Sequence, residues 1–117
     1  MSQAEQDRRI DYIEFLATNV DETKRFYSKV FGWKFTDYGP TYTSFTDGRM
    51  NGGFTAAEEV RSGGPLVVLY STNLSDMESR VRDAGGTIVR ETFAFPGGRR
   101  FHFADPSGNE LAIWSDR

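Results

Sequence analysis

The sequence predicts an α+β protein made of two tandem βαβββ modules, with helices packed against the sheet. The first observation is an internal repeat, in which the segment Thr18–Glu22 (TNVDE) recurs as Thr72–Asp76 (TNLSD). The second is that each copy follows a strand-like run and precedes a helix-like segment that ends at glycine. The third is that short strand-like runs then complete each unit. An unrelated α+β sandwich would not require this repeated entry.

Module one is expected over residues 10–56. It opens with a strand over Ile10–Thr18, and a helix with Asp21 as its N-cap follows. Phe26 and Val30 lie at i, i+4 spacing on this helix before Gly32, so they should face the sheet. Gly39-Pro40 and Asp47-Gly48 then separate the remaining strands, which are expected over Trp33–Tyr38, Thr41–Thr46 and Met50–Thr55.

Module two is expected over residues 65–115, after a connector over residues 57–64 that has no periodicity. Its first strand is predicted over Pro65–Thr72, and its helix begins at an N-cap Ser75 and ends before Gly85-Gly86. The strands that follow are expected over Thr87–Phe95, Arg100–Ala104 and Glu110–Ser115. Residues 1–9 should be a disordered or frayed tail, so that residues 10–117 form a single domain.

The composition excludes several classes of protein. A chain of 117 residues favours one domain, and no apolar run approaches the roughly 20 residues of a membrane span. The net charge is −3 and no basic cluster exceeds Arg99-Arg100, so we expect no nucleic-acid or membrane partner. The absence of cysteine excludes thiolate catalysis, disulfides and cysteine zinc sites, and it agrees with a cytoplasmic location.

The C-terminal strands should form a β-hairpin around the turn Asp105–Asn109. Because side chains alternate along a strand, one face of this hairpin is apolar and the other is mixed. The same alternation predicts which side chains pack against the helices: Phe15, Leu69, Phe103 and Leu111. The mixed face should line a ligand groove.

These motifs resemble the vicinal oxygen chelate superfamily, which includes glyoxalase I, bleomycin-resistance proteins, fosfomycin-resistance enzymes and extradiol dioxygenases. The resemblance rests on Phe26-Tyr27 leading to Phe31–Phe35 (FGWKF), on Ala84–Gly86 (AGG), and on Asp105–Asn109 (DPSGN), in paired βαβββ modules. The resemblance implies that the two modules form a curved mixed sheet around a concave groove, with the helices on the outer face. Because family members of this length commonly pair, it also implies a homodimer. It also implies that metal-dependent members carry their ligands at one inward position on each of four strands.

At those four strand positions this sequence carries no metal-binding side chains. The positions align with Tyr12, Leu66, Ala112 and the segment Asn51–Gly53. A divalent metal needs about three donors of His, Asp, Glu or Cys type. We therefore expect neither a metal nor another cofactor. The alternative is a non-standard metal site made by Glu14, His102 and Glu110, all predicted to point inward.

Side chains of inward parity define the expected pocket, and its candidate ligand-binding residues are Tyr12, Leu66, Tyr70, Arg100, Glu110, Ala112 and Trp114. Glu14 and His102 are the candidate catalytic residues, because a carboxylate in an apolar strand and an imidazole can both move protons near neutral pH. Simpler roles stay open. Glu14 could pair with Arg100, His102 could be a satisfied strand residue, Glu110 could face water, and the aromatic side chains could pack the sheet or a dimer surface.

Two functions follow from the resemblance and these residues. The first is a metal-free protein that binds a small organic molecule, as bleomycin-resistance proteins do, without changing a bond. The alternative is a lyase or isomerase of glyoxalase type in which Glu14 or His102 transfers a proton. Such an enzyme would need Arg100 or Tyr12 in place of a metal to stabilise developing charge. A third possibility is a groove filled by aromatic side chains that binds nothing.

Overall fold

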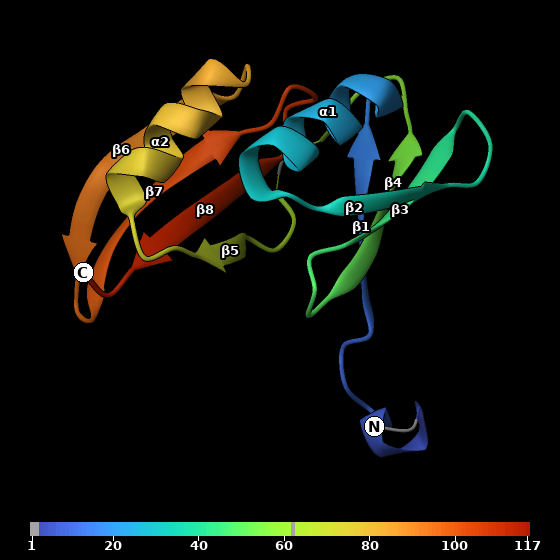
Figure 1. Ribbon diagram of the computed structural model, residues 1–117, viewed down its shortest axis with the longest axis horizontal. Coiled ribbons are helices and arrows are strands. Elements are labelled where there is room, and N and C mark those ends of the chain that lie inside the picture. The colour runs from blue at the N-terminus through green and yellow to red at the C-terminus, as the bar shows by residue number, and fades with distance from the viewer. Residues whose placement is uncertain (1–2, 62) are drawn as a thin grey trace.

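The computed structural model describes residues 3–61 and 63–117, and it contains the two expected βαβββ modules (Figure 1). The first two residues of the expected tail and one connector residue lie outside this described part. A short 3-10 turn, Gln3–Gln6, precedes module one. Module one consists of β1 (Tyr12–Ala17), α1 (Val20–Phe31), β2 (Lys34–Asp37), β3 (Tyr42–Thr46) and β4 (Asn51–Ala56). Module two consists of β5 (Val67–Tyr70), α2 (Leu74–Asp83), β6 (Thr87–Phe95), β7 (Gly98–Ala104) and β8 (Glu110–Ser115).

Each module forms its own four-stranded sheet with the same topology, in the orders β1-β4-β3-β2 and β5-β8-β7-β6. The first strand of each module pairs in parallel with the last, and the other pairs are antiparallel. The helix in each module supplies the crossover that a parallel pair requires. Both helices lie on one side of the two sheets in Figure 1. The predicted α+β class and the tandem modules are therefore confirmed.

Both helices begin two residues earlier than predicted. The N-caps are Asn19 and Asn73, not Asp21 and Ser75, because each asparagine has an extended backbone and its side chain accepts a hydrogen bond from the backbone N–H three residues on. Asp21 lies in the first turn of α1 instead, where a negative charge is favourable. The predicted end of α1 is confirmed, since Gly32 adopts a left-handed backbone with φ of 75°.

An aromatic core joins α1 to both sheets. The Tyr27 ring stacks on Trp33 at 4.6 Å, and Trp33 stacks on Phe45 of β3 at 4.3 Å. On the other side, the Phe26 ring lies 6.1 Å from Phe103 of β7. Because α1 contacts a strand of each module, the two modules share one hydrophobic core.

Asp105 fixes the second contact between the modules, at the turn between β7 and β8. Its Oδ1 accepts the backbone N–H groups of Ser107 and Asn109, both at 2.9 Å. Its Oδ2 accepts the Tyr27 hydroxyl at 2.8 Å. Burial, followed by the nearby Asp105 charge and this hydrogen bond, raises the pKa of Tyr27 well above its ordinary value, so that the phenol stays a donor.

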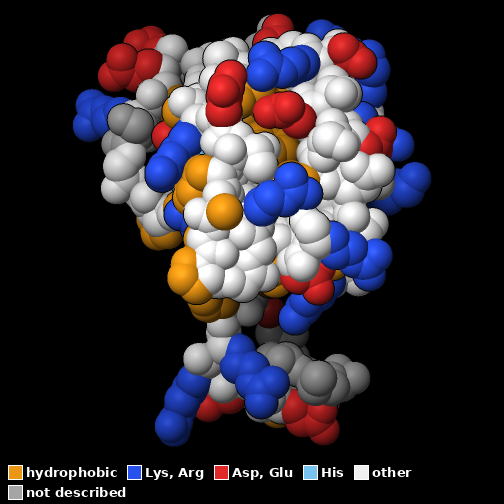
Figure 2. All heavy atoms as spheres, turned by 90° about the vertical axis from the view of Figure 1, so that its left-hand side faces the viewer, with side chains coloured by type: hydrophobic (Ala, Val, Ile, Leu, Met, Phe, Trp, Pro, Cys, Tyr) orange, Lys and Arg blue, Asp and Glu red, His pale blue; other side chains and the backbone are white. Residues whose placement is uncertain are grey.

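The predicted alternation of side chains is confirmed in the strands that decide it. Phe103 and Leu111 are fully buried on the helix side, and Phe15 and Leu69 pack partly buried against the same core. We call the opposite face of each sheet its inner face. Figure 2 views the molecule from the module-two end, where positive and negative side chains are interspersed with hydrophobic ones. In the described part of the chain, no helix is long and apolar enough to cross a membrane.

Candidate functional site

The inner face of module one is set by the register of three strands. Glu14 of β1 lies opposite Gly53 of β4, and Gly53 lies opposite Ser44 of β3. Alternation then places Tyr12 and Tyr42 on the same face. Tyr12 is 42% exposed, so this face is accessible to a ligand.

A chain of hydrogen bonds crosses this face from Tyr12 to Glu14. The Tyr42 hydroxyl donates to Glu14 Oε1 at 2.9 Å, and the Tyr12 hydroxyl lies 2.5 Å from the Tyr42 hydroxyl. Because a phenol has one proton, and Tyr42 gives it to Glu14, the bond between the two tyrosines must be donated by Tyr12. The Tyr12 oxygen therefore offers acceptor lone pairs to the inner face.

Gly53 makes this network possible. A Cβ at Gly53 would lie 2.1 Å from the Tyr42 hydroxyl oxygen and 2.5 Å from that of Tyr12. The two phenols thus occupy the space that a side chain on β4 would fill. Desolvation, followed by the hydrogen bonds with Tyr12 and Glu14, raises the pKa of Tyr42, so Tyr42 remains a neutral donor.

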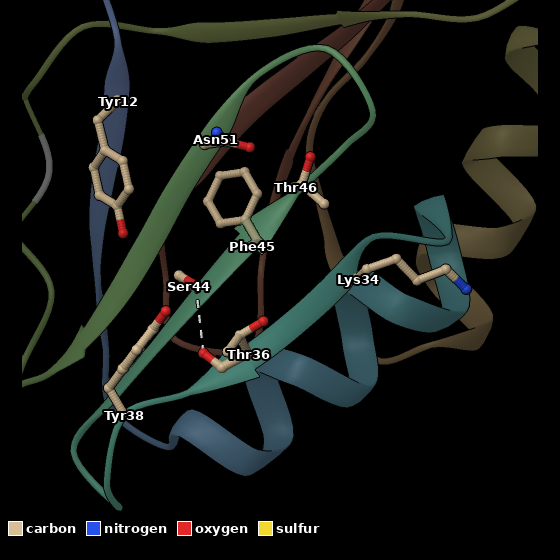
Figure 3. Close-up of a pocket in the computed structure, with 8 residues that line it drawn as sticks. All are labelled: Tyr12, Lys34, Thr36, Tyr38, Ser44, Phe45, Thr46 and Asn51. Atoms are coloured by element: carbon tan, nitrogen blue, oxygen red, sulfur yellow. Dashed lines mark hydrogen bonds between the residues drawn. The ribbon is translucent and has the colours of Figure 1, made fainter.

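A pocket of about 420 Å³ opens on the same face (Figure 3). Tyr12 of β1 and Asn51 of β4 lie on one side of it, while Tyr38 and Thr36 come from the β2 end. Aromatic side chains alternate in its wall with hydroxyl and amide groups, and the full lining is Tyr12, Lys34, Thr36, Tyr38, Ser44, Phe45, Thr46 and Asn51. Mixed walls of this kind are typical of small-molecule sites.

The inner face of module two carries most of the predicted site residues. His102 Nδ1 lies 2.9 Å from Glu110 Oε2, and the Tyr70 and Trp114 rings meet edge to face at 5.1 Å. Arg100 lies on the same face of β7 as His102. Glu110 is therefore a partner of His102, and its side chain is also 44% exposed, as expected of a carboxylate that faces water. Ala112 lies between His102 and Val68 in the sheet, and Leu66 is exposed just before β5.

Glu14 does not join this group. It lies on the first sheet with Tyr42, whereas His102 and Glu110 lie on the second. The ion pair between Glu14 and Arg100, which the sequence left open, does not form. Glu14 accepts a hydrogen bond from Tyr42 instead, and Arg100 Nε has no hydrogen-bond partner. Among residues 3–61 and 63–117, no group of three or more acidic or histidine side chains could hold a metal ion. The alternative metal site of Glu14, His102 and Glu110 therefore does not form within one chain.

The ligand positions of metal-dependent relatives do not fit a metal in this structure. Gly53 of β4 lies opposite Glu14 of β1, and Ala112 of β8 lies opposite Val68 of β5. Because the repeat aligns Glu14 with Val68, Gly53 corresponds to Ala112. Two of the aligned positions thus hold a glycine and an alanine, and the others hold Tyr12 and Leu66. Neither hydrocarbon side chains nor a phenol that donates its proton to Tyr42 supply the required donor set.

Tyr42 is the main site residue that the sequence reasoning missed. The alternation of side chains places Tyr42 on the same face as Ser44 and Thr46 of the predicted strand. Alternation does not show which residue of β1 lies near Tyr42, so it could not predict the hydrogen bond to Glu14. Arg90 and Phe93 of β6 were also missed. Both lie opposite inner-face residues of β7, although they are three positions apart, because the register of β6 shifts between them.

Comparisons with known proteins agree with the fold. The Glyoxalase/Bleomycin resistance protein/Dioxygenase superfamily profile matches residues 9–113. A glyoxalase/bleomycin resistance protein/dioxygenase family enzyme from Burkholderia phytofirmans superimposes with a TM-score of 0.81 at 17% identity, covering 92% of this chain and 100% of that one. No curated protein sequence matches the chain.

Two further solved structures carry more specific descriptions. A lactoylglutathione lyase from Agrobacterium tumefaciens has a TM-score of 0.70 at 17% identity, covering 92% of this chain and 93% of that one. The fosfomycin resistance protein FosX from Listeria monocytogenes, in a complex with Mn(II), has a TM-score of 0.80 at 12% identity, with coverage of 92% and 89%. At these identities the likeness shows the fold alone. Together with the profile match over most of its length, it establishes that the chain belongs to the Glyoxalase/Bleomycin resistance protein/Dioxygenase superfamily.

Proposed function

We propose that this protein binds a small organic molecule on the inner faces of its sheets, without a metal ion. The observation that carries the proposal is the Tyr12–Tyr42–Glu14 network, which places oriented oxygen atoms beside the pocket of about 420 Å³. Fixed polar groups among aromatic walls give a site its orientation and specificity. Because the donors of metal-dependent relatives are replaced, binding itself is the function that this geometry supports best.

One observation favours an enzyme as the second candidate. An ionised Glu110 can only accept a hydrogen bond, so its contact with His102 Nδ1 fixes the proton on that nitrogen. In the neutral ring, Nε2 is then left as a free base. A carboxylate that orients an imidazole is a recurring arrangement in proton transfer, and it supports a lyase or isomerase reaction at His102. Glu14 is the other candidate for proton transfer.

We infer that the acting form is a cytoplasmic homodimer. A contact between two equivalent copies would cover the sheet edges that the two short modules leave open, at β1, β2, β5 and β6. The absence of cysteine agrees with a reducing compartment. Light scattering at micromolar concentration should give the mass of two chains, and a monomeric mass would contradict the dimer.

A thermal-shift screen of small molecules on metal-stripped protein tests the binding function. We expect at least one compound to raise the melting temperature equally with and without a chelator. Glu14→Gln should reduce that shift, since it removes the charge that anchors the network. Glu22→Gln is the matched control, because it makes the same change on the exposed surface of α1.

Three results decide between the alternatives. A divalent metal retained at one equivalent per chain after chelation, measured by elemental analysis, would overturn the metal-free proposal. Conversion of a bound compound, lost in His102→Ala, would establish the enzyme instead. If no compound shifts the melting temperature, the pocket is not a binding site.

A further inference from the structure

We propose that the inner face of module two binds the carboxylate of a planar aromatic acid. Arg100 and His102 hold the carboxylate, and the rings of Trp114 and Tyr70 contact the aromatic ring of the ligand. This inference rests on the proposed binding function and names a ligand class for it.

The first observation is a pair of buried nitrogen atoms without partners. In the described part of the chain, the only buried side-chain nitrogen or oxygen atoms that make no hydrogen bond are Arg100 Nε and His102 Nε2. The two residues lie two positions apart on β7, so their side chains share the inner face. His102 is only 8% exposed. Buried polar atoms are nearly always satisfied in proteins, so two adjacent exceptions point to a missing partner.

The comparison of modules explains why Arg100 lacks a partner. His102 of β7 lies opposite Ala112, and Ser44 of β3 lies opposite the equivalent Gly53. Arg100 and Tyr42 each come two residues before these positions, so they correspond to each other. In module one the carboxylate of Glu14 satisfies Tyr42 across Gly53. In module two the residue aligned with Glu14 is Val68, which has no acceptor. In module two, the acidic partner that Glu14 provides in module one must therefore be supplied by a ligand.

Arg100 Nε, joined by His102 Nε2 when the imidazole is protonated, specifies an anion. Arg100 Nε is a permanent donor and needs an acceptor. Because Glu110 holds the proton on His102 Nδ1, a protonated ring also donates from Nε2. A carboxylate presents two acceptor oxygens to these two donors, and charge-assisted hydrogen bonds of this type are the strong ones. Neither Arg90 nor Arg100 forms an ion pair within residues 3–61 and 63–117, so positive charge is available here.

Aromatic rings and arginines continue from this point across the whole sheet. The Arg90 guanidinium lies 3.6 Å from the centre of the Phe93 ring, and the Arg100 guanidinium lies 5.3 Å from the same ring. Arg100 is also 5.7 Å from the Phe95 ring, which lies 6.3 Å from Trp114. Figure 2, which faces this end of the molecule, shows basic side chains among hydrophobic ones. Such a surface suits a ligand that is both flat and negatively charged.

Tyr70 completes the aromatic wall at the far edge of the sheet. Its hydroxyl donates to Asp116 Oδ1 at 2.6 Å, which fixes the ring while leaving it 48% exposed. The exposed ring lies beside Trp114. Together the two side chains offer apolar surface close to Arg100, because Trp114 lies directly opposite Arg100 in the sheet.

Phe93 is the side chain that must move to admit the carboxylate. Its ring centre lies 6.0 Å from that of His102, and it also contacts Arg100. Phe93 lies on the edge strand β6, next to a break in the pairing register. Edge strands with bulges re-aim side chains at low structural cost, so we expect Phe93 to rotate away from His102 and Arg100 when the ligand binds.

Calorimetry with three naphthalene probes tests the ligand class. The probes are 2-naphthoate, the neutral 2-naphthalenemethanol and the cationic 2-naphthylmethylamine. We expect 2-naphthoate to bind at least ten-fold more tightly than either of the others and to change the fluorescence of Trp114. Trp33 is buried in the core and should contribute a constant background.

Variants then locate the carboxylate. Arg100→Gln should weaken 2-naphthoate binding at least ten-fold, and Arg100→Lys should also weaken it, since lysine keeps the charge but lacks the Nε donor. Arg99→Gln is the matched control, because Arg99 is exposed on the same strand and bonds the backbone of Arg117. Binding of 2-naphthoate that survives both Arg100 changes, or that Arg99→Gln weakens equally, would overturn the proposal.

The outcome also separates this inference from the proposed function. If all three probes bind equally, binding without a metal stands and the acid class is wrong. If 2-naphthoate does not bind while the screen finds compounds that Glu14→Gln weakens, ligands use module one and this inference is wrong. Tight binding of the amine alone would likewise contradict an anion site.

Discussion

Gly53 of β4 and Ala112 of β8 occupy equivalent positions in the two modules, yet their neighbours differ. Over Gly53, the hydroxyls of Tyr12 and Tyr42 meet and the second donates to Glu14, so the polar groups of module one satisfy one another. Beside Ala112, Arg100 and His102 each leave a buried nitrogen without a partner. The two modules, which share one topology, thus present one face that is internally satisfied and one that is not.

This difference teaches that a repeated fold does not imply a repeated site. Two differences, Val68 in place of Glu14 and Arg100 in place of Tyr42, leave a basic residue of module two unpaired two strands away from Val68. Unsatisfied polar groups destabilise a fold, so their presence on one module only supports the proposal that this face binds a ligand. The comparison can be tested by substitutions, taken here from the largest expected effect to the smallest.

The largest effect should separate the two faces of β7. Phe103→Ala should lower the free energy of unfolding by about 3 to 5 kcal/mol, because it opens a cavity beneath α1. His102→Ala, on the inner face of the same strand, should lower it by only about 1 kcal/mol. Chemical denaturation of both variants measures the difference. A larger loss for His102→Ala would mean that this face stabilises the fold and is not available for binding.

The next effect compares the two hairpin turns. Asp105→Ala should lower the free energy of unfolding by about 2 to 4 kcal/mol, because it leaves the buried Tyr27 hydroxyl and two backbone N–H groups without an acceptor. Asp47 makes similar bonds to the backbone of Arg49 and Met50, but it is exposed. Water can replace it there, so Asp47→Ala should lower the stability by less than about 1 kcal/mol. If Asp105→Ala and Asp47→Ala lower the stability equally, the burial of Asp105 beside Tyr27 does not explain the cost of removing its carboxylate.

The sequence predicted the features that depend on local alternation and on the repeat. Both modules, the turn at Asp105 and the helix-facing positions of Phe103 and Leu111 follow from these patterns. The predicted N-caps lie two residues after the observed ones, Asn19 and Asn73. The acidic and hydroxyl residues that follow each asparagine are also good N-caps. Local patterns cannot separate competing caps within one turn.

The missed contacts depend on pairing between strands. The bond from Tyr42 to Glu14 crosses β4, so it requires the register of two strand pairs that are distant in sequence. On β6, shifts of register place Arg90 and Phe93 opposite His102 and Arg100. An odd separation puts two residues on opposite faces of a regular strand, so alternation alone predicts the wrong face for one of them.

A smaller effect should follow from making module two resemble module one. Val68→Glu places a carboxylate at the position equivalent to Glu14, where it can pair with Arg100. We expect it to weaken 2-naphthoate binding about ten-fold, because the new acid competes for the same donor. Val68→Gln is the control of similar shape without the charge. If both variants weaken binding equally, the effect is steric and the argument from the comparison is wrong.

The smallest effect concerns an ion pair that module one has and module two lacks. Lys24 Nζ of α1 bonds both carboxylate oxygens of Asp37 of β2 at 2.9 Å. At the repeat-aligned position of α2, Glu78 instead pairs with Arg82 along the helix at 3.9 Å. The hydrogen bond from Lys24 is the main cause that lowers the pKa of Asp37 below its ordinary value of 3.8. A lowered pKa in the folded state means that the pair stabilises the protein above pH 3.8 and that this contribution is lost as the pH decreases through the folded value.

Lys24→Met should therefore lower the urea midpoint slightly at pH 7, and the difference from the parent protein should disappear toward pH 2. Methionine keeps most of the aliphatic stem, so packing against the helix is largely preserved. Added salt should reduce the difference at pH 7, since Asp37 is exposed to solvent. Arg82→Met, which removes the longer pair on α2, should change the midpoint less at every pH. A difference for Lys24→Met that is constant between pH 7 and pH 2 would assign its effect to packing, and the two modules would then not differ in electrostatic stabilisation of their helices.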